Sequence, residues 1–155
     1  MGRQSRSAVG GTRAGHTAGR PFEDEDPFVV RESLADVDID REVSGSTYIV
    51  PDKFWGISVA GREDHPGVCL SCSEMNQSAV MLKGSDEVMR RTHTFVIEPS
   101  RDNGLRKATA FELTPRRFRL RRLLLLHYDR RLGRLDTNDL AALRQALERR
   151  FPLIL

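Results

Sequence analysis

The chain has 155 residues, of which 39% are hydrophobic and 30% are charged, and its formal net charge is +3. This length suits one domain, and the low apolar content indicates that part of the chain lies outside a folded core. Two cysteines are too few for a secreted disulfide scaffold, no apolar run approaches the ~20 residues of a membrane span, and the first residues lack a signal peptide's apolar segment. We therefore expect a cytoplasmic protein without a membrane partner.

Charge is unevenly distributed along the chain. Residues 1–20 carry four Arg and no acid, whereas residues 21–42 carry nine acids against two Arg, a net charge of −7. Subtracting both segments from the total leaves +6 for residues 43–155. We expect residues 1–44 to be a disordered tail, basic over 1–20 and acidic over 21–42, and residues 45–151 to form the domain. A basic domain behind an acidic tail indicates a polyanionic partner.

The acidic segment allows two interpretations. It is either a solvated linker or an arm that lies on the basic face of the domain and is displaced by the ligand. Apolar residues are spread through it, and residues 33–41 are compatible with a short helix or an extended arm.

The first elements predicted in chain order are short strands. Apolar or β-branched runs between turn residues predict strands at 47–50, 67–72, 79–83, 94–98 and 109–113, with 57–60 as a candidate further strand. Pro99 ends one of these runs, and Asn103-Gly104 predicts a turn.

The C-terminal part predicts a long strand followed by a helix. Over 118–127, Phe118 and Leu120 alternate with arginines, and the continuous run 123–126 indicates a strand covered on both sides. After Arg134, apolar residues recur at helical spacing, with Asp136 or Thr137 as N-cap and Pro152 as the stop. Five or six strands and one amphipathic helix predict a small barrel or strongly bent sheet with helical cover.

The two cysteines form one C-x-x-C, Cys69 and Cys72. A structural zinc site needs four ligands, and His65, His93 and His127 stand at no established spacing from the cysteines. In a straight strand the two thiols point to opposite faces, which favours small core residues over a shared metal. A zinc-stabilised interaction domain is kept as a third hypothesis.

Two residues at predicted loops and strand ends could carry chemistry. His65 lies in a polar loop before a proline, where it is either a surface residue or a proton-transfer group. Ser85 follows Gly84 without the G-x-S-x-G pattern of a hydrolase, so by itself it indicates a turn.

Arginine clustering is the strongest compositional signal. Residues 101–134 hold eleven Lys or Arg against three acids. A solvated face explains part of this, but a dense and mostly Arg cluster is better explained by phosphate contact. Trp55 either belongs to the core or adds a stacking surface for bases. The candidate RNA-binding residues are Trp55, Arg101, Arg116, Arg117 and Arg119.

The order of several short motifs resembles the MazF/PemK toxin family. The motifs are Gly45-Ser-Thr-Tyr-Ile-Val-Pro51, His65-Pro-Gly-Val-Cys-Leu70, Ala79-Val-Met-Leu-Lys-Gly-Ser85, Thr94-Phe-Val-Ile-Glu-Pro99, Thr109-Ala-Phe-Glu-Leu113 and Leu132-Gly-Arg-Leu135. The match spans roughly residues 45–150.

The resemblance implies an SH3-like β-barrel, mainly β with a C-terminal α-helix, that forms a homodimer and cuts single-stranded RNA without a metal or other cofactor. It also implies an antitoxin protein whose acidic tail occupies the RNA groove. The resemblance suggests His65 as general acid or base, Ser85 as a ligand of the scissile phosphate, and Lys83 and Arg62 as stabilisers of its charge.

The sequence departs from the family where an arginine commonly precedes the proline, a position that His65 holds here. Histidine transfers protons but cannot hold a phosphate in a bidentate way. Arg62, from the same loop, is the expected substitute. The alternative reading is a catalytically inactive PemK-like module that binds nucleic acid or a partner. Residues 1–44 have no counterpart in compact family members, and their acidic part suggests partial self-inhibition.

Overall fold

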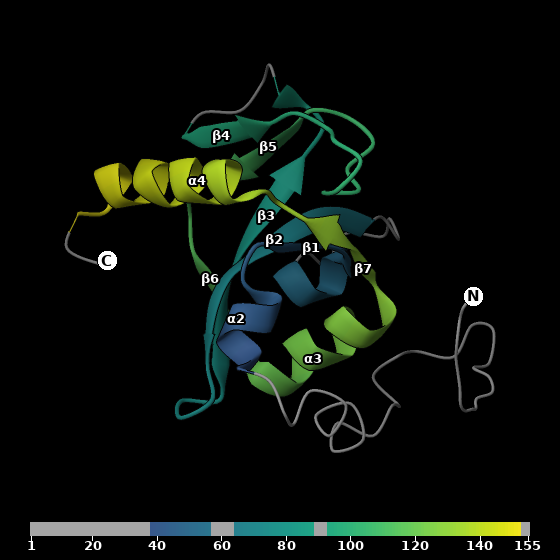
Figure 1. Ribbon diagram of the computed structural model, residues 1–155, viewed down its shortest axis with the longest axis vertical. Coiled ribbons are helices and arrows are strands. Elements are labelled where there is room, and N and C mark those ends of the chain that lie inside the picture. The colour runs from purple at the N-terminus through teal and green to yellow at the C-terminus, as the bar shows by residue number, and fades with distance from the viewer. Residues whose placement is uncertain (1–37, 57–63, 89–92, 153–155) are drawn as a thin grey trace.

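The computed structural model describes residues 38–56, 64–88 and 93–152. The elements are α2 (Ile39–Val43), β1 (Ser46–Pro51), the 3₁₀ helix η3 (Asp52–Trp55), β2 (Asp64–Ser73), β3 (Ser78–Ser85), β4 (Thr94–Ile97), β5 (Thr109–Glu112), β6 (Arg116–Arg119), α3 (Leu120–Asp129), β7 (Arg131–Arg134) and α4 (Thr137–Arg150). The fold is mainly β, a curled antiparallel half-barrel with a C-terminal helix (Figure 1).

The sheet runs in the order β4-β5-β3-β2-β1-β7, and β6 also pairs with β3. Two parts of β3 pair with two different strands. Its residues 78–81 pair with β6, whereas Gly84 and Ser85 pair with β5. β2 and β3 are the longest strands and lie at the centre of the sheet (Figure 1). The start of β2 therefore meets the end of β1, where the candidate site is built.

Two hydrophobic cores cover the two faces of the central strands. One contains Cys69 and Met81 and is closed by α2, η3 and α3, whereas the other contains Val68 and Leu82 and is closed by α4. Alternate residues of β2 and β3 point to opposite faces. Because each face packs against one of the two cores, the residues that point to either face are buried. This explains why β2 and β3 read as continuous apolar runs.

Several predicted elements are confirmed. β1, β4 and β5 lie where the sequence places them, and β2 and β3 extend beyond the predicted runs. The C-terminal helix begins after Asp136, whose carboxylate accepts a hydrogen bond from the Asp139 N–H at 2.7 Å. It ends at Arg150, before Pro152, and buries Leu143 and Leu147. The candidate strand at 57–60 lies outside the described residues.

The long strand predicted at 118–127 is wrong. The segment is instead split into the short strand β6 and helix α3, which begins at Leu120, and β7 follows it. Leucine and arginine are good helix formers, and the segment lacks the β-branched residues typical of strands. The apolar run is buried on all sides because α3 packs into the first core.

The straight-strand prediction for the two cysteines is also wrong. The β2–β3 register shifts between Cys69 and Ser71, which is a bulge in β2. One extra residue reverses the alternation, so Cys69 and Cys72 pair with Met81 and Ala79 on the same face. Both cysteines are free thiols.

The predicted domain boundary at residue 45 omits α2. Ile39 and Val43 are buried in the first core, and three carbonyls at the end of this helix, those of residues 41, 42 and 44, accept hydrogen bonds from Arg134. The acidic residues 38–42 therefore belong to the fold, whereas residues 1–37 of the predicted tail lie outside the described residues. In the described parts, no helix combines the length and apolar character needed to cross a membrane.

Candidate functional site

His65 and Asp52 meet where β2 begins and β1 ends. The register pairs Val50 with His65 and Pro51 with Asp64, so the first residue of η3 lies beside the start of β2. The Asp52 Oδ1 atom is 2.5 Å from the His65 Nδ1 atom. The side chain of Asp52 is 8% exposed and that of His65 is 21% exposed. A shielded carboxylate thus orients the ring, and proton transfer at this ring would use Nε2.

His65 lines a hollow of about 600 Å³. Its cationic residues are Arg106 and Lys107, and its acids are Asp64, Asp86 and Glu87. Lys107 Nζ lies 3.5 Å from Asp86 Oδ2 in an exposed pair, which solvent weakens. Arg106 is exposed at the wall of the same hollow, and its guanidinium forms no ion pair with the residues that the structure describes.

Lys83 and Ser85 are predicted site residues that the structure buries. Lys83 is 5% exposed, and its Nζ atom lies 3.5 Å from Glu112 Oε2. Ser85 is 3% exposed, and its Oγ atom accepts a hydrogen bond from the Glu87 N–H at 3.1 Å. Neither lines the His65 hollow. In this conformation they support the strand end rather than present groups to a ligand.

Trp55 is also buried, at 4% exposure. Its ring packs against Phe118, with centroids 5.1 Å apart, and a Cβ added to Gly67 would lie 2.8 Å from it. Arg116 lies over the same ring at 5.8 Å and donates a hydrogen bond to the Trp55 carbonyl oxygen at 2.8 Å. Trp55 is therefore a core residue in this conformation, and its role as a stacking surface for bases stays a prediction.

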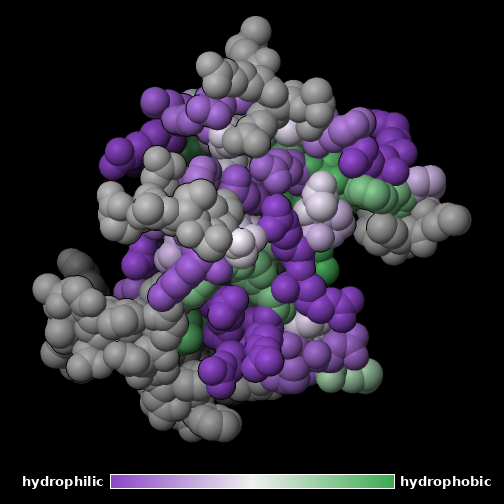
Figure 2. All heavy atoms as spheres, turned by 180° about the vertical axis from the view of Figure 1, so that it is seen from behind, coloured by the Kyte–Doolittle hydropathy of each residue, from purple (hydrophilic) through white to green (hydrophobic). Residues whose placement is uncertain are grey.

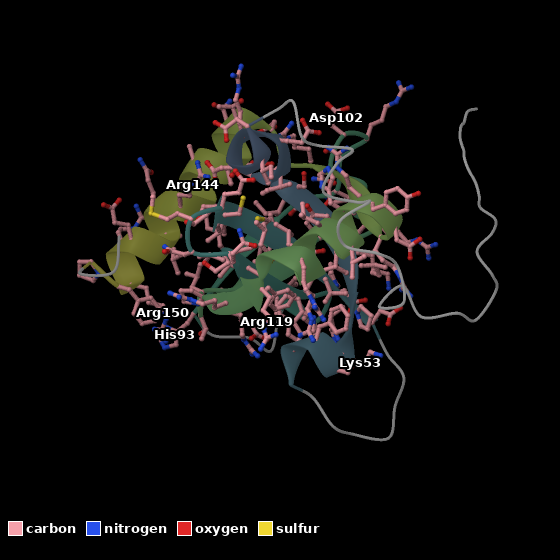
Figure 3. The ribbon with its side chains drawn as sticks, turned by 90° about the horizontal axis from the view of Figure 1, so that it is seen from below. Lys53, His93, Asp102, Arg119, Arg144 and Arg150 are labelled. Atoms are coloured by element: carbon pink, nitrogen blue, oxygen red, sulfur yellow. The ribbon has the colours of Figure 1, made fainter. Side chains whose placement is uncertain are left out.

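The arginine cluster read from the sequence is divided in space. Arg116, Arg117 and Arg119 belong to β6, whereas Arg101 lies in the turn beside β7. Figure 3 shows Arg119 and Asp102, the neighbour of Arg101, far apart. Hydrophilic residues cover much of the face seen in Figure 2. The charge thus forms separate patches rather than one groove.

Two residues at the site were not found from the sequence, and one predicted residue is not described. Neither Asp52 nor Arg106 belongs to a motif that the sequence shows. The β1–β2 register brings Asp52 beside His65, and the course of the chain before β5 brings Arg106 to the same hollow. Arg62 lies outside the described residues, so its role stays a prediction.

The cysteines do not form a metal site with their described surroundings. Among the described residues, no three His, Cys, Asp or Glu side chains come together as possible metal ligands. Burial raises the pKa of the Cys69 thiol well above its usual value and, together with Asp40, raises that of Cys72 to about 11. Both thiols are thus kept protonated at neutral pH.

Comparison with known proteins leaves the family open. The chain matches no protein-family model, and a search of curated proteins gave no significant match.

Proposed function

We propose that this protein is an endoribonuclease that cuts single-stranded RNA without a metal, a toxin of the MazF/PemK type. The observation that carries the proposal is the contact between His65 and the shielded Asp52 carboxylate at the wall of a hollow that also holds Arg106 and Lys107. A half-buried histidine oriented by a carboxylate is a suitable proton-transfer group.

The chemistry follows from these positions. His65 Nε2 takes the proton from the ribose 2′-hydroxyl as its oxygen attacks the adjacent phosphorus. The bond from phosphorus to the 5′-oxygen breaks, and a proton returned from the solvent or the protonated ring neutralises the leaving oxygen. Arg106 and Lys107 bind the phosphate oxygens and stabilise the negative charge that develops on them. Arg62 remains a candidate for the same task.

The resemblance supplies the remaining parts of the proposal. It implies a homodimer with an SH3-like barrel, controlled by an antitoxin protein, and we propose a cytoplasmic location from the low cysteine content. The curled half-barrel sheet is compatible with such a barrel.

The test is cleavage of a long, defined single-stranded RNA with EDTA present. Wild type should give discrete fragments, His65→Ala should give none, and Asp52→Asn should be slower because the ring loses its orienting carboxylate. His93→Asn is the matched control, since His93 does not line the hollow and asparagine tolerates its φ of 55°. Equal cleavage by wild type and His65→Ala would refute the proposed site.

A second candidate function is a non-catalytic module that binds RNA. Burial of Lys83 and Ser85 favours it, because the strand end that the resemblance marks as catalytic is closed. Salt-sensitive RNA binding without any cleavage would support this alternative.

A further inference from the structure

A hollow beside β6 carries a surplus of positive charge. It has a volume of about 490 Å³ and lies between residues 76–78 of the β2–β3 hairpin and residues 117–121. Its charged lining residues are Arg117, Arg119 and Arg121, and none of the described residues that line it is acidic. All three arginines are exposed, and their guanidinium groups form no ion pair with the residues that the structure describes. We call this cavity the β6 hollow.

The walls of the β6 hollow are fixed by hydrogen bonds. The Asn76 N–H donates to Ser73 Oγ at 3.0 Å, which holds the tip of the hairpin. The Leu120 N–H donates to the Gln77 carbonyl at 2.9 Å, which joins the hairpin to the start of α3. The arginines therefore project from ordered strand and helix positions, and an anion that binds them loses less free energy to ordering.

A second hollow along β6 extends the positive surface. It has a volume of about 590 Å³ and shares Arg117 with the β6 hollow. Its other cations are Arg116 and Arg144, and Glu148 is the acid among its described lining residues. Arg116 lies 3.7 Å from a carboxylate oxygen of Glu112, so Arg117 and Arg144 supply most of the charge that this hollow offers to a ligand.

The His65 hollow has the opposite balance of charge. Arg106 and Lys107 face three acids there, whereas the β6 hollow has three cations and no described acid. Each phosphate of an RNA strand is negative, and a surface of one sign raises the local concentration of a ligand of the other sign. The hollow that holds the proposed chemistry is therefore not the one that best attracts a polyanion.

The two hollows lie toward opposite ends of β2. His65 is the second residue of this strand, whereas residues 76–78 follow its last residue, Ser73. A strand of ten residues spans up to roughly 30 Å, and the two hollows share no residue. An extended RNA of several nucleotides covers such a distance, whereas a single nucleotide does not.

We infer that the β6 hollow is a second binding site for single-stranded RNA, which holds phosphates several nucleotides away from the bond that is cut. Arg117 and Arg119 alternate along β6, so they lie on one face about 6.6 Å apart, close to the length of one extended nucleotide. Arg119 projects outward in Figure 3. Each guanidinium binds phosphate oxygens through paired N–H groups. The identity of this ligand rests on the proposed function.

The test measures binding of an RNA strand of about twenty nucleotides, 2′-O-methylated so that it has no attacking hydroxyl. R117Q/R119Q should weaken its affinity about a hundredfold, since two hydrogen-bonded charges are removed. The slope of log affinity against log salt should fall by about 1.4. R131Q/R149Q is the matched control, because it removes two exposed arginines that line none of the three hollows. It should weaken binding by no more than about threefold, because salt screens distant charges.

His65→Ala separates the second site from the first. It should abolish cleavage of unmodified RNA but bind the methylated strand as tightly as wild type, which is the reverse of the defect in R117Q/R119Q. RNA of the same sequence with uncharged methylphosphonate linkages should bind wild type at least tenfold more weakly, because phosphate charge carries the contact. Equal urea unfolding midpoints for wild type and R117Q/R119Q report that the fold is intact.

The outcomes separate this inference from the proposed function. Wild-type affinity in R117Q/R119Q, or an equal loss in R131Q/R149Q, would overturn the inference and leave cleavage at His65 standing. Tight binding that depends on Arg117 and Arg119, without any cleavage, would support the second site and refute the endoribonuclease. Tighter binding of poly-glutamate than of RNA with the same number of charges would overturn the inference in favour of an acidic protein partner.

Discussion

Two histidines of this protein make similar first contacts in different surroundings. His65 Nδ1 meets the Asp52 carboxylate and lines the open hollow, whereas His127 Nδ1 meets the Tyr48 hydroxyl at 2.8 Å inside the first core. Burial raises the pKa of the Tyr48 hydroxyl well above its usual value, so the hydroxyl stays protonated and donates to His127. Burial, followed by Arg131, lowers the pKa of His127 to about 4.

The comparison shows that a histidine's neighbours decide what it can do. His65 has a carboxylate that orients its ring and an opening through which a substrate can approach. His127 is held neutral chiefly by its burial, and Arg131 and Arg134 oppose its proton more than Glu42, at 3.8 Å, favours it. The first suits proton transfer, and the second suits a structural role.

The largest expected effect is loss of cleavage on removal of His65. His65→Ala should lower the rate of RNA cleavage roughly 10²- to 10⁴-fold, the usual contribution of a proton-transfer group. His127→Gln should leave cleavage at the wild-type rate at neutral pH, where His127 is uncharged. Initial rates on one defined RNA measure both effects. A similar loss of cleavage in His65→Ala and His127→Gln would contradict the proposed difference in role between the two histidines.

The next effect concerns stability in acid. The pKa of His127 is lower in the folded protein than its ordinary value of 6.5, so the unfolded chain binds this proton more readily. Its contribution to stability is fully present above pH 6.5 and is lost as the pH falls to about 4, with a total on the order of 3 kcal/mol. Urea unfolding of wild type and His127→Gln at several pH values gives the difference. The two curves should converge in acid, and parallel curves would contradict the assignment.

A smaller effect is expected at the phosphate-binding side of the hollow. Arg106→Ala should weaken binding of single-stranded RNA about tenfold, the scale of one hydrogen bond to a charged group. The slope of log affinity against log salt should fall by about 0.7, since one fewer phosphate is neutralised. Arg149→Ala, on the exposed side of α4, is the control. Equal losses in both variants would show that only net charge matters.

The smallest effect belongs to the Tyr48 hydroxyl. Tyr48→Phe should lower the free energy of unfolding at neutral pH by about 1 kcal/mol, because His127 loses its donor inside the core. Urea unfolding measures the change, and cleavage should stay at the wild-type rate. A loss of cleavage without a loss of stability would assign the His127 region to the site after all.

Local pattern was enough for some elements and misleading for others. The helical stripe and Asp136 predicted α4, and three strands were placed from their runs alone. The pattern of residues 118–127 predicts one strand where the structure has β6 and α3, because a fully buried apolar run has no period that separates strand from helix. The spacing of the two cysteines predicts opposite faces, because the bulge in β2 leaves no mark in the sequence.

For the candidate site, the sequence indicated His65 and a surplus of arginine, which are properties of single residues and of composition. The partner of His65 was decided by the register of β1 against β2, which no local pattern reports. Packing likewise decided that three of the predicted site residues are buried, namely Lys83, Ser85 and Trp55. Sequence by itself determined the short strands, the last helix and the uneven charge, because these depend on neighbours along the chain. Tertiary structure alone decided which charges meet and which are exposed, because these depend on segments far apart in sequence.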